Sequence, residues 1–253
     1  MNKIIIIKYG ELTTKKDNIN YFLKALKKNI EDNLVGINHE TTYDSSRMFI
    51  KTDDFDRVVT KLKKIFGIHK ITIAYEMAND LETIKSNLIT LLKEYDFKTF
   101  KVEVKRSYKK YPGTSMEISA SLGAYILKNI SEKKVDVHTP DILINVEIRK
   151  DHSYLYFEDI KGLGGYPVGV AGKGLLMLSG GIDSPVSGYL AIKRGIKLEC
   201  IYFEAPPHTS KEAKNKVLEL ARKLAVYNDT YIKVHVINFT EIEEAIYKNI
   251  PND

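Results

Sequence analysis

The feature that most constrains the fold of this chain is a short apolar run that leads into a glycine turn. Residues 175–178 are all apolar and too few for an independent helix, so they predict a buried strand. A turn of small residues follows at 179–181, where glycine negotiates the tight backbone easily. Asp183 and Ser184 can cap the helix that begins there, and Pro185 suits its first turn. This order gathers free backbone N–H groups at the positive end of a helix and therefore predicts an anion site.

The residue pattern of the turn narrows the kind of anion. The sequence contains neither the Gly-x-x-x-x-Gly-Lys-Ser/Thr pattern of a Walker loop nor the Gly-x-Gly-x-x-Gly pattern of a dinucleotide fold. Residues 179–184, Ser-Gly-Gly-Ile-Asp-Ser, instead resemble the pyrophosphate loop of ATP pyrophosphatases, which activate a substrate as its adenylate. The alternative is a plain strand–helix turn rich in small residues.

Composition and charge bound the protein class. The 253 residues are enough for one large domain or for two to three smaller ones. Lys and Arg number 39 against 33 Asp and Glu, which allows a polyanionic partner without requiring one. Cys200 is the only cysteine, so no intrachain disulfide forms, and a reducing cytoplasm is expected. No apolar stretch approaches eighteen residues, so neither a membrane span nor a membrane partner is expected.

Hydrophobic periodicity predicts a ferredoxin-like unit over residues 1–77. The expected β-α-β-β-α-β order is typical of that fold. One helix is predicted at 16–34. A second helix is predicted to be capped by Asp53 or Asp54 and to end at Gly67. The strands are predicted at 3–9, 37–43, 47–52 and 68–77.

A second α/β unit is predicted to follow. Its helices are expected to begin at two capping boxes, Asn79 with Glu82 and Thr114 with Glu117. Strands are expected at 99–105, 135–137, 142–149 and 154–160. Between the first strand and the second helix lies a basic loop with two tyrosines. Its cations Lys105, Arg106, Lys109 and Lys110 can contact phosphates, although such lysine-rich loops are also common as solvated surface.

A glycine-rich linker precedes a third unit. Five glycines and a proline fall within residues 161–172, which indicates either a domain boundary, placed here, or a backbone that must pack closely. Strands at 174–178, 197–203 and 230–238 then alternate with helices at 185–194, after Thr209 and after Thr240, where Glu212 and Glu243 complete the expected caps. This alternation predicts a doubly wound parallel sheet, whose ligands lie beyond the carboxyl ends of the strands.

Further motifs extend the resemblance beyond the pyrophosphate loop. Tyr9-Gly10-Glu11-Leu12 follows the first strand, and Val146-Glu147-Ile148-Arg149 lies in the second unit. The linker reads Gly162-x-Gly164-Gly165-x-Pro167-Val168-Gly169, and Pro206-Pro207-His208-Thr209-Ser210 follows the second strand of the third unit. Together these motifs resemble the tRNA 4-thiouridine synthetases, or tRNA sulfurtransferases, over essentially the whole chain.

The resemblance implies an α/β multi-domain protein. It comprises a ferredoxin-like domain (1–77), an α/β THUMP RNA-binding domain (78–161, or about 54–161 as the family draws it), a linker (162–173) and a partial doubly wound ATP pyrophosphatase domain (174–253). In this family, ATP and Mg adenylate uridine 8 of tRNA. A cysteine desulfurase supplies persulfide sulfur that replaces the activated oxygen. A sulfur-transfer role for the thiamine thiazole is implied as well, and a homodimer is left open.

The resemblance also assigns site residues. The phosphates of ATP are expected at Ser179, Gly180, Gly181, Asp183 and Ser184, with Asp183 as the candidate Mg ligand. The nucleoside is expected at Met177, Leu178, Tyr202 and Phe203. For Leu178 above all, plain sheet core is the competing interpretation. The basic loop is expected to face tRNA.

Two departures from the family pattern bear on these expectations. Ile19 stands where the family usually has an arginine. Cys200 does not match the family's catalytic cysteine and is expected to be a core residue, so the chain alone is expected to be inactive. Two other functions stay open: another adenylating pyrophosphatase, or a non-catalytic RNA-binding protein with a vestigial nucleotide domain.

Overall fold

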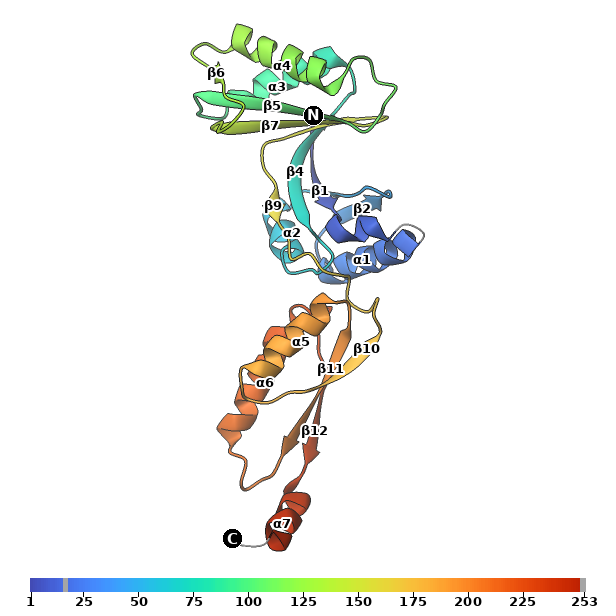
Figure 1. Cartoon of the computed structure of the whole chain (residues 1–253), viewed down its shortest axis with the longest axis vertical. Helices are drawn as coiled ribbons and strands as arrows, with labels where there is room; N and C mark the ends of the chain where they lie inside the picture. Colours follow the sequence, from blue (N-terminus) through green and yellow to red (C-terminus); the bar gives the residue numbers. More distant parts are fainter. Residues whose placement is uncertain (16–17, 251–253) are drawn as a thin grey trace. The chain divides into compact units, whose positions relative to one another are not determined.

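The computed structural model describes residues 1–15 and 18–250, and the chain divides into two compact units (Figure 1). The first unit comprises Met1–Ile7, Phe49–Thr52 and Ile71–Ile160. The second comprises Lys8–Met48, Asp53–Lys70 and Lys161–Asp253. Along the chain, the elements up to residue 77 follow the order β1-α1-β2-β3-α2-β4, which confirms the ferredoxin-like order predicted from periodicity.

The first unit is built on a mixed β-sheet with two helices on one face (Figure 1). The helices are α3 (Leu81–Leu92) and α4 (Ser115–Asn129), and they enclose an apolar core with the sheet. β5 pairs in parallel with β7, and β8 pairs antiparallel with both β7 and β4. The strands, in sheet order, are β3 (Arg47–Thr52), β1 (Asn2–Lys8), β4 (Lys70–Met77), β8 (Ser153–Tyr156), β7 (Ile142–Ile148), β5 (Thr99–Arg106) and β6 (Lys134–Val135).

The capping box of α4 is confirmed, but that of α3 is wrong. Thr114 and Glu117 form the reciprocal bonds expected of them. At α3 the cap is Asp80, whose carboxylate accepts from the Thr83 N–H at 2.7 Å. Asn79 is engaged elsewhere, because its amide donates to the Arg149 and Lys150 carbonyls at 2.6 and 2.9 Å.

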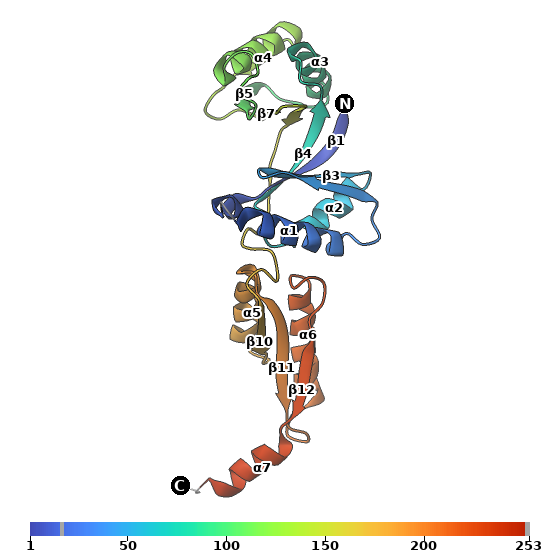
Figure 2. The ribbon, with the colours of Figure 1, turned by 90° about the vertical axis from the view of Figure 1, so that its right-hand side faces the viewer.

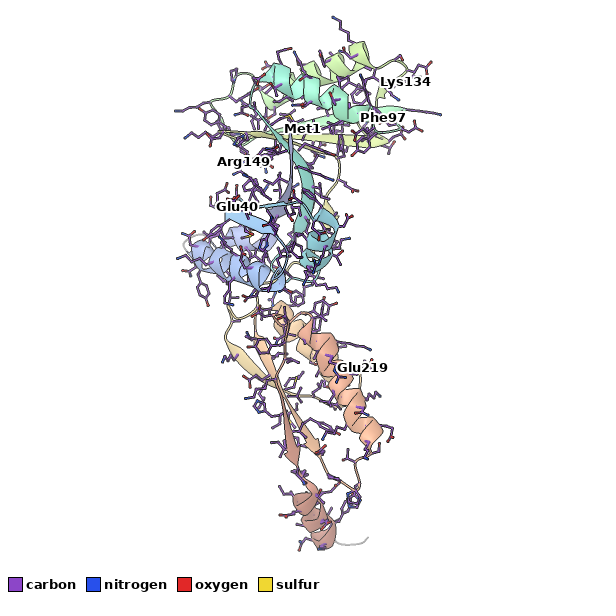
Figure 3. The ribbon with its side chains drawn as sticks, turned by 180° about the vertical axis from the view of Figure 1, so that it is seen from behind. Met1, Glu40, Phe97, Lys134, Arg149 and Glu219 are labelled. Atoms are coloured by element: carbon purple, nitrogen blue, oxygen red, sulfur yellow. The ribbon has the colours of Figure 1, made fainter. Side chains whose placement is uncertain are left out.

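Arg149, labelled in Figure 3, follows β7 and is held by its own unit. Its guanidinium lies 5.3 Å from the centroid of the Phe49 ring, and its Nη1 lies 3.3 Å from Oε1 of the buried Glu147. A buried carboxylate needs such a partner, since burying an unpaired charge is costly. The Glu147 and Arg149 positions of the predicted motif therefore have a structural role.

The second unit holds α1 (Ile19–Asn33), β2 (His39–Tyr43) and α2 (Phe55–Leu62), preceded by a 3-10 turn at Gly10–Thr14. The expected start of the first helix at Lys16 lies outside the described residues, and the described helix begins at Ile19. Asp54 caps α2, as one of the two predicted alternatives, by accepting from the Arg57 N–H at 3.3 Å.

The glycine-rich linker packs closely within the second unit. On one side the Gly67 N–H donates to the Gly164 carbonyl at 2.8 Å, and the Gly162 N–H donates to the His69 carbonyl at 2.9 Å. On the other side the Tyr166 N–H donates to the Lys193 carbonyl at 2.9 Å. Of the two interpretations of the glycines, close backbone packing is therefore confirmed. The domain boundary at this place stays a prediction.

The rest of the second unit is a three-stranded parallel sheet in the order β10-β11-β12. Figures 1 and 2 show α5 and α6 on one face of this sheet, and their apolar residues form a core with β11. The strands are β10 (Lys173–Met177), β11 (Lys197–Glu204) and β12 (Val234–Asn238), and the helices are α5 (Asp183–Lys193), α6 (Lys211–Ala225) and α7 (Thr240–Asn249). The α/β class predicted for this part is confirmed.

Three local predictions in this part of the chain are wrong: the caps of α6 and α7 and the start of β12. Ser210, not Thr209, caps α6, because the Thr209 hydroxyl already accepts from the Ala205 N–H at 2.9 Å. Phe239 precedes α7 without any side-chain cap, so Thr240 is the first helical residue. β12 begins at Val234 rather than at 230, since Thr230 has a φ of 71°, which no strand adopts.

Within residues 1–15 and 18–250, no helix is long and apolar enough to cross a membrane.

Candidate functional site: a pocket at the ends of β10 and β11

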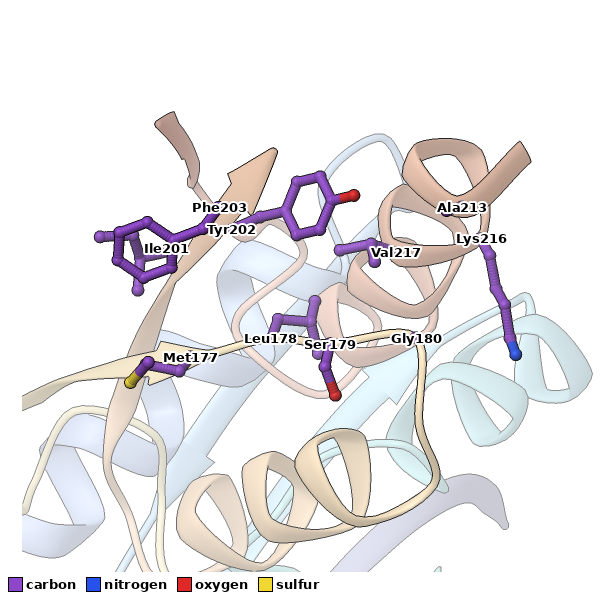
Figure 4. Close-up of a pocket in the computed structure, with 10 residues that line it drawn as sticks. All are labelled: Met177, Leu178, Ser179, Gly180, Ile201, Tyr202, Phe203, Ala213, Lys216 and Val217. Carbon is purple, nitrogen blue, oxygen red and sulfur yellow. The ribbon is translucent and has the colours of Figure 1, made fainter. Parts of the chain in front are cut away.

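A pocket of about 410 Å³ opens where β10 and β11 end, with α6 as its far wall (Figure 4). Six residues predicted for the site line it: Met177, Leu178, Ser179, Gly180, Tyr202 and Phe203. The pocket lies at the carboxyl ends of parallel strands, which is where α/β sheets bind their ligands. Gly181, Asp183 and Ser184 are not among its lining residues and lie in the adjoining loop and first helical turn.

Two serines close the loop on itself. The Ser184 hydroxyl accepts from the Ser179 N–H at 3.0 Å and lies 3.1 Å from the Ser179 hydroxyl. Ser184 therefore holds the turn in shape instead of capping α5, which corrects the sequence prediction. Asp183 does not act as the cap either, because α5 starts at Asp183 and follows Ile182 without a side-chain cap. The first N–H groups of α5 are left for another acceptor.

The loop glycines are not required by backbone conformation, contrary to the expectation that only glycine negotiates this turn. Neither Gly180 nor Gly181 has a φ in the left-handed region. A Cβ on Gly180 would lie 3.6 Å from Lys216 Cδ, and one on Gly181 would lie 3.5 Å from Ser179 Oγ, both ordinary contacts. The protein itself would accept alanine here. Glycine leaves the loop backbone open to close approach by a ligand, as phosphate-binding loops require.

The four residues predicted for the nucleoside differ in exposure. Leu178 and Tyr202 are 3% and 8% exposed and belong to the core between sheet and helices. Met177 and Phe203 are 69% and 39% exposed. The Phe203 ring is supported edge-on by Phe239, with 5.5 Å between centroids. The pocket therefore offers an apolar wall suited to an aromatic base, and core packing holds Leu178 and Tyr202 of that wall in place.

Metal binding by protein side chains alone is not indicated. Among the described residues, no group of three or more His, Cys, Asp or Glu gathers in a way that could hold a metal ion. Mg²⁺ needs no such group when it is bound with a nucleotide, since one or two carboxylates and the substrate phosphates suffice. The exposed Asp183 beside the loop fits that pattern.

Sequence reasoning missed four lining residues: Ile201, Ala213, Lys216 and Val217. Helical periodicity predicts that Ala213 and Val217 lie on the inner face of their helix, but nothing in the sequence links that face to the loop. Lys216 belongs to no motif. It lies three residues beyond Ala213, one helical turn along the same face, and that spacing is the signal that could have found it.

The predicted basic loop lies in the first unit. Lys105, Lys109 and Lys110 are exposed. Lys105 and Arg106 are the last two residues of β5 and not part of the loop. Arg106 is half-buried, and its Nη1 donates to the Tyr111 carbonyl at 2.6 Å, so it holds the loop from the end of the strand. RNA contact by all four cations stays a prediction, with Arg106 the least available of them.

Cys200 is a core residue, as expected. Its side chain is fully buried within the apolar core between β11 and the helices. Burial raises the pKa of its thiol to about 11, so the reactive thiolate is scarce near neutral pH.

A strand, a glycine loop and a helix start without a side-chain cap, beside an apolar wall, are typical of nucleotide-binding α/β proteins of the pyrophosphate-loop class. Three family descriptions match along the chain: a ThiI ferredoxin-like domain at 4–72, a THUMP domain at 78–158 and Thiamine biosynthesis protein (ThiI) at 169–253. The chain belongs to this ThiI family, which confirms the predicted resemblance and the three-part fold class.

Relatives cover nearly the whole chain. A "Probable tRNA sulfurtransferase" of Geobacillus kaustophilus is 44% identical over 98% of this chain and 63% of the relative. One of Clostridium acetobutylicum is 44% identical over 100% of this chain and 66% of the relative. The chain thus spans slightly under two thirds of the length of these curated relatives.

Two solved structures resemble the fold closely. One is a crystal structure of a 4-thiouridine synthetase in complex with RNA and with bound ATP, with a TM-score of 0.85, 36% identity, and coverage of 99% of this chain and 66% of that one. The other is PH1313 from Pyrococcus horikoshii, with a TM-score of 0.81, 29% identity, and coverage of 97% and 82% respectively.

Proposed function

We propose that this protein is an ATP-dependent tRNA sulfurtransferase that makes 4-thiouridine at position 8 of tRNA. The observation that carries the proposal is the pocket at β10 and β11, because one cavity joins the glycine loop to an apolar wall. Relatives named tRNA sulfurtransferases and an ATP-bound 4-thiouridine synthetase of similar fold support it. A family description that names thiamine biosynthesis supports a second use of the same sulfur transfer, toward the thiamine thiazole.

In the proposed reaction, the 4-oxygen of the uridine attacks the α-phosphate of ATP and pyrophosphate leaves. The loop N–H groups and the α5 N-terminus would stabilise the charge that develops on the departing phosphates. Ser184 would keep Ser179 and the loop in the receiving shape. Mg²⁺, held by Asp183 and phosphate oxygens, would neutralise part of the same charge.

The outer sulfur of a persulfide then attacks C4 of the uridine, and AMP leaves. A thiol next attacks the inner sulfur of the persulfide, so that the S–S bond breaks, a disulfide forms and 4-thiouridine is released. We propose a cysteine desulfurase as the source of the persulfide. Cys200 is not proposed as the sulfur carrier, since it is fully buried and its thiol pKa is raised to about 11. The thiolation step is therefore proposed for the whole protein, and nucleotide and RNA binding for the chain of residues 1–253.

Calorimetry and a thiolation assay test this function. We expect the chain to bind ATP in the presence of Mg²⁺ and to bind tRNA. The whole protein with a cysteine desulfurase should convert uridine to 4-thiouridine, measured by mass spectrometry of the digested tRNA. RNA binding without any ATP binding would instead favour the non-catalytic alternative. ATP binding with adenylation of a small molecule only would favour another adenylating pyrophosphatase.

The exposed lysines of the basic loop give a separate prediction for tRNA. Replacing Lys105, Lys109 and Lys110 together by alanine should weaken tRNA binding and reduce the slope of log K against log salt by about two to three, since each phosphate contact releases counterion. Binding is measured by filter retention across a salt series. Replacing Lys61, Lys63 and Lys64 of the second unit removes the same charge elsewhere and serves as the control. An unchanged slope in the loop variant would mean that these lysines do not contact tRNA phosphates.

A further inference from the structure

Lys216 is the charged residue among the described side chains that line the pocket. It comes from α6, which forms the wall opposite the strand ends. Its neighbour Lys214 is already neutralised, because its ammonium lies 2.8 Å from the Glu204 carboxylate. In the described part of the chain no carboxylate pairs with Lys216, and no acidic side chain lines the pocket. The pocket therefore has a net positive charge from this one residue.

The position of Lys216 relative to the loop decides which part of a ligand it could reach. Its Cδ lies 3.6 Å from where a Cβ of Gly180 would stand, so its stem passes directly over the loop. Figure 4 shows the side chain running down from α6 beyond Gly180, whereas Met177, Ile201 and Phe203 lie at the opposite end of the pocket. An ammonium group in this place faces the phosphate end of a nucleotide and not its base.

We propose that Lys216 binds the outer phosphates of ATP and thereby makes the pocket selective for the triphosphate over AMP. This assignment rests on the proposed ATP site and adds a contact to it. A lysine on a flexible stem can follow a phosphate as a point charge, which suits a group that must first hold the triphosphate and then release pyrophosphate. AMP would keep the apolar wall and the loop but would not reach the ammonium.

Titration calorimetry with ATP and with AMP tests the proposal on residues 1–253. Lys216→Met keeps the apolar stem and removes the charge. We expect it to weaken ATP binding about tenfold, the lower end for a hydrogen bond to a charged group because the site is open to solvent, and to change AMP binding by less than about twofold. Lys216→Arg should restore most of the ATP affinity, since it restores the charge.

Lys223→Met is the matched control. Lys223 lies two turns further along the same face of α6 and pairs with Glu219 at 3.0 Å, so its replacement should leave both affinities unchanged. ATP affinity that survives in Lys216→Met, or an equal loss for ATP and AMP, would overturn the assignment while leaving the pocket as the ATP site. An unmodified chain that binds neither nucleotide would overturn the proposed function and this assignment with it.

Discussion

Asp183→Ala in the whole protein should lower tRNA thiolation by about 100-fold or more and leave tRNA affinity near normal. The carboxylate stands at the first position of α5, directly after the loop, where it can hold Mg²⁺ against the phosphates of ATP. Loss of one group that stabilises transition-state charge typically costs this much. The rate is measured as 4-thiouridine formed per unit time, with ATP, Mg²⁺ and a cysteine desulfurase in excess.

Asp56→Ala provides a matched control for that variant. Asp56 is also an exposed carboxylate in the first turn of a helix, α2 of the same unit, so its loss removes the same favourable interaction with a helix dipole. We expect a small loss of stability and full thiolation activity. If Asp183→Ala keeps its activity, the assignment of the loop to ATP is wrong. If both variants lose activity equally, the effect is one of folding.

Gly165→Ala should destabilise the second unit by about 3 kcal/mol, the sum of a left-handed backbone penalty and a steric clash. Gly165 has a φ of +74°, and a Cβ there would lie 2.4 Å from the Lys193 carbonyl oxygen. Its N–H also donates to the Glu11 carboxylate at 2.8 Å, so the linker has little room to move aside. We expect the melting temperature to fall by about 6–12 °C, followed by circular dichroism.

Gly172→Ala separates the two causes. Gly172 belongs to the same linker and has a φ of +85°, but nothing lies within 4 Å of the Cβ it would gain. Its cost should be the backbone penalty alone, about 1 kcal/mol. Equal losses in both variants would mean that the close approach to Lys193 contributes nothing. Glu11→Ala, which removes only the acceptor, provides a milder second measure of how tightly the linker is held.

Local patterns predicted the order of helices and strands well, because each element is defined by its own periodicity. They predicted helix caps less well. At two of the failures, two neighbouring polar residues could cap, and a tertiary contact engaged one of them. Asn79 bonds to the backbone of Arg149 and Lys150, which leaves Asp80 as the cap of α3. Thr209 bonds to Ala205, which leaves Ser210 as the cap of α6.

In the candidate site, too, local patterns predicted some features, and tertiary contacts decided others. The loop and the strand ends were found from sequence because they are contiguous motifs, and six of their residues meet in one pocket. Lys216 was not found, because only the packing of α6 against β11 brings that helix beside the loop. The role of Ser184 was also misassigned, since its bond to Ser179 depends on how sharply the loop turns.

The sequence by itself determined that this chain has a ferredoxin-like order, a second α/β unit after it and a strand–loop–helix that predicts an anion site, because these follow from neighbouring residues. Only the tertiary structure decided why the linker is rich in glycine. Gly162 and Gly165 each lie against a carbonyl oxygen far away in sequence, at Ile68 and Lys193, where a Cβ would come within 2.3 and 2.4 Å. The sequence of the linker does not predict the contacts with those two oxygens, since they belong to segments that meet the linker only after folding.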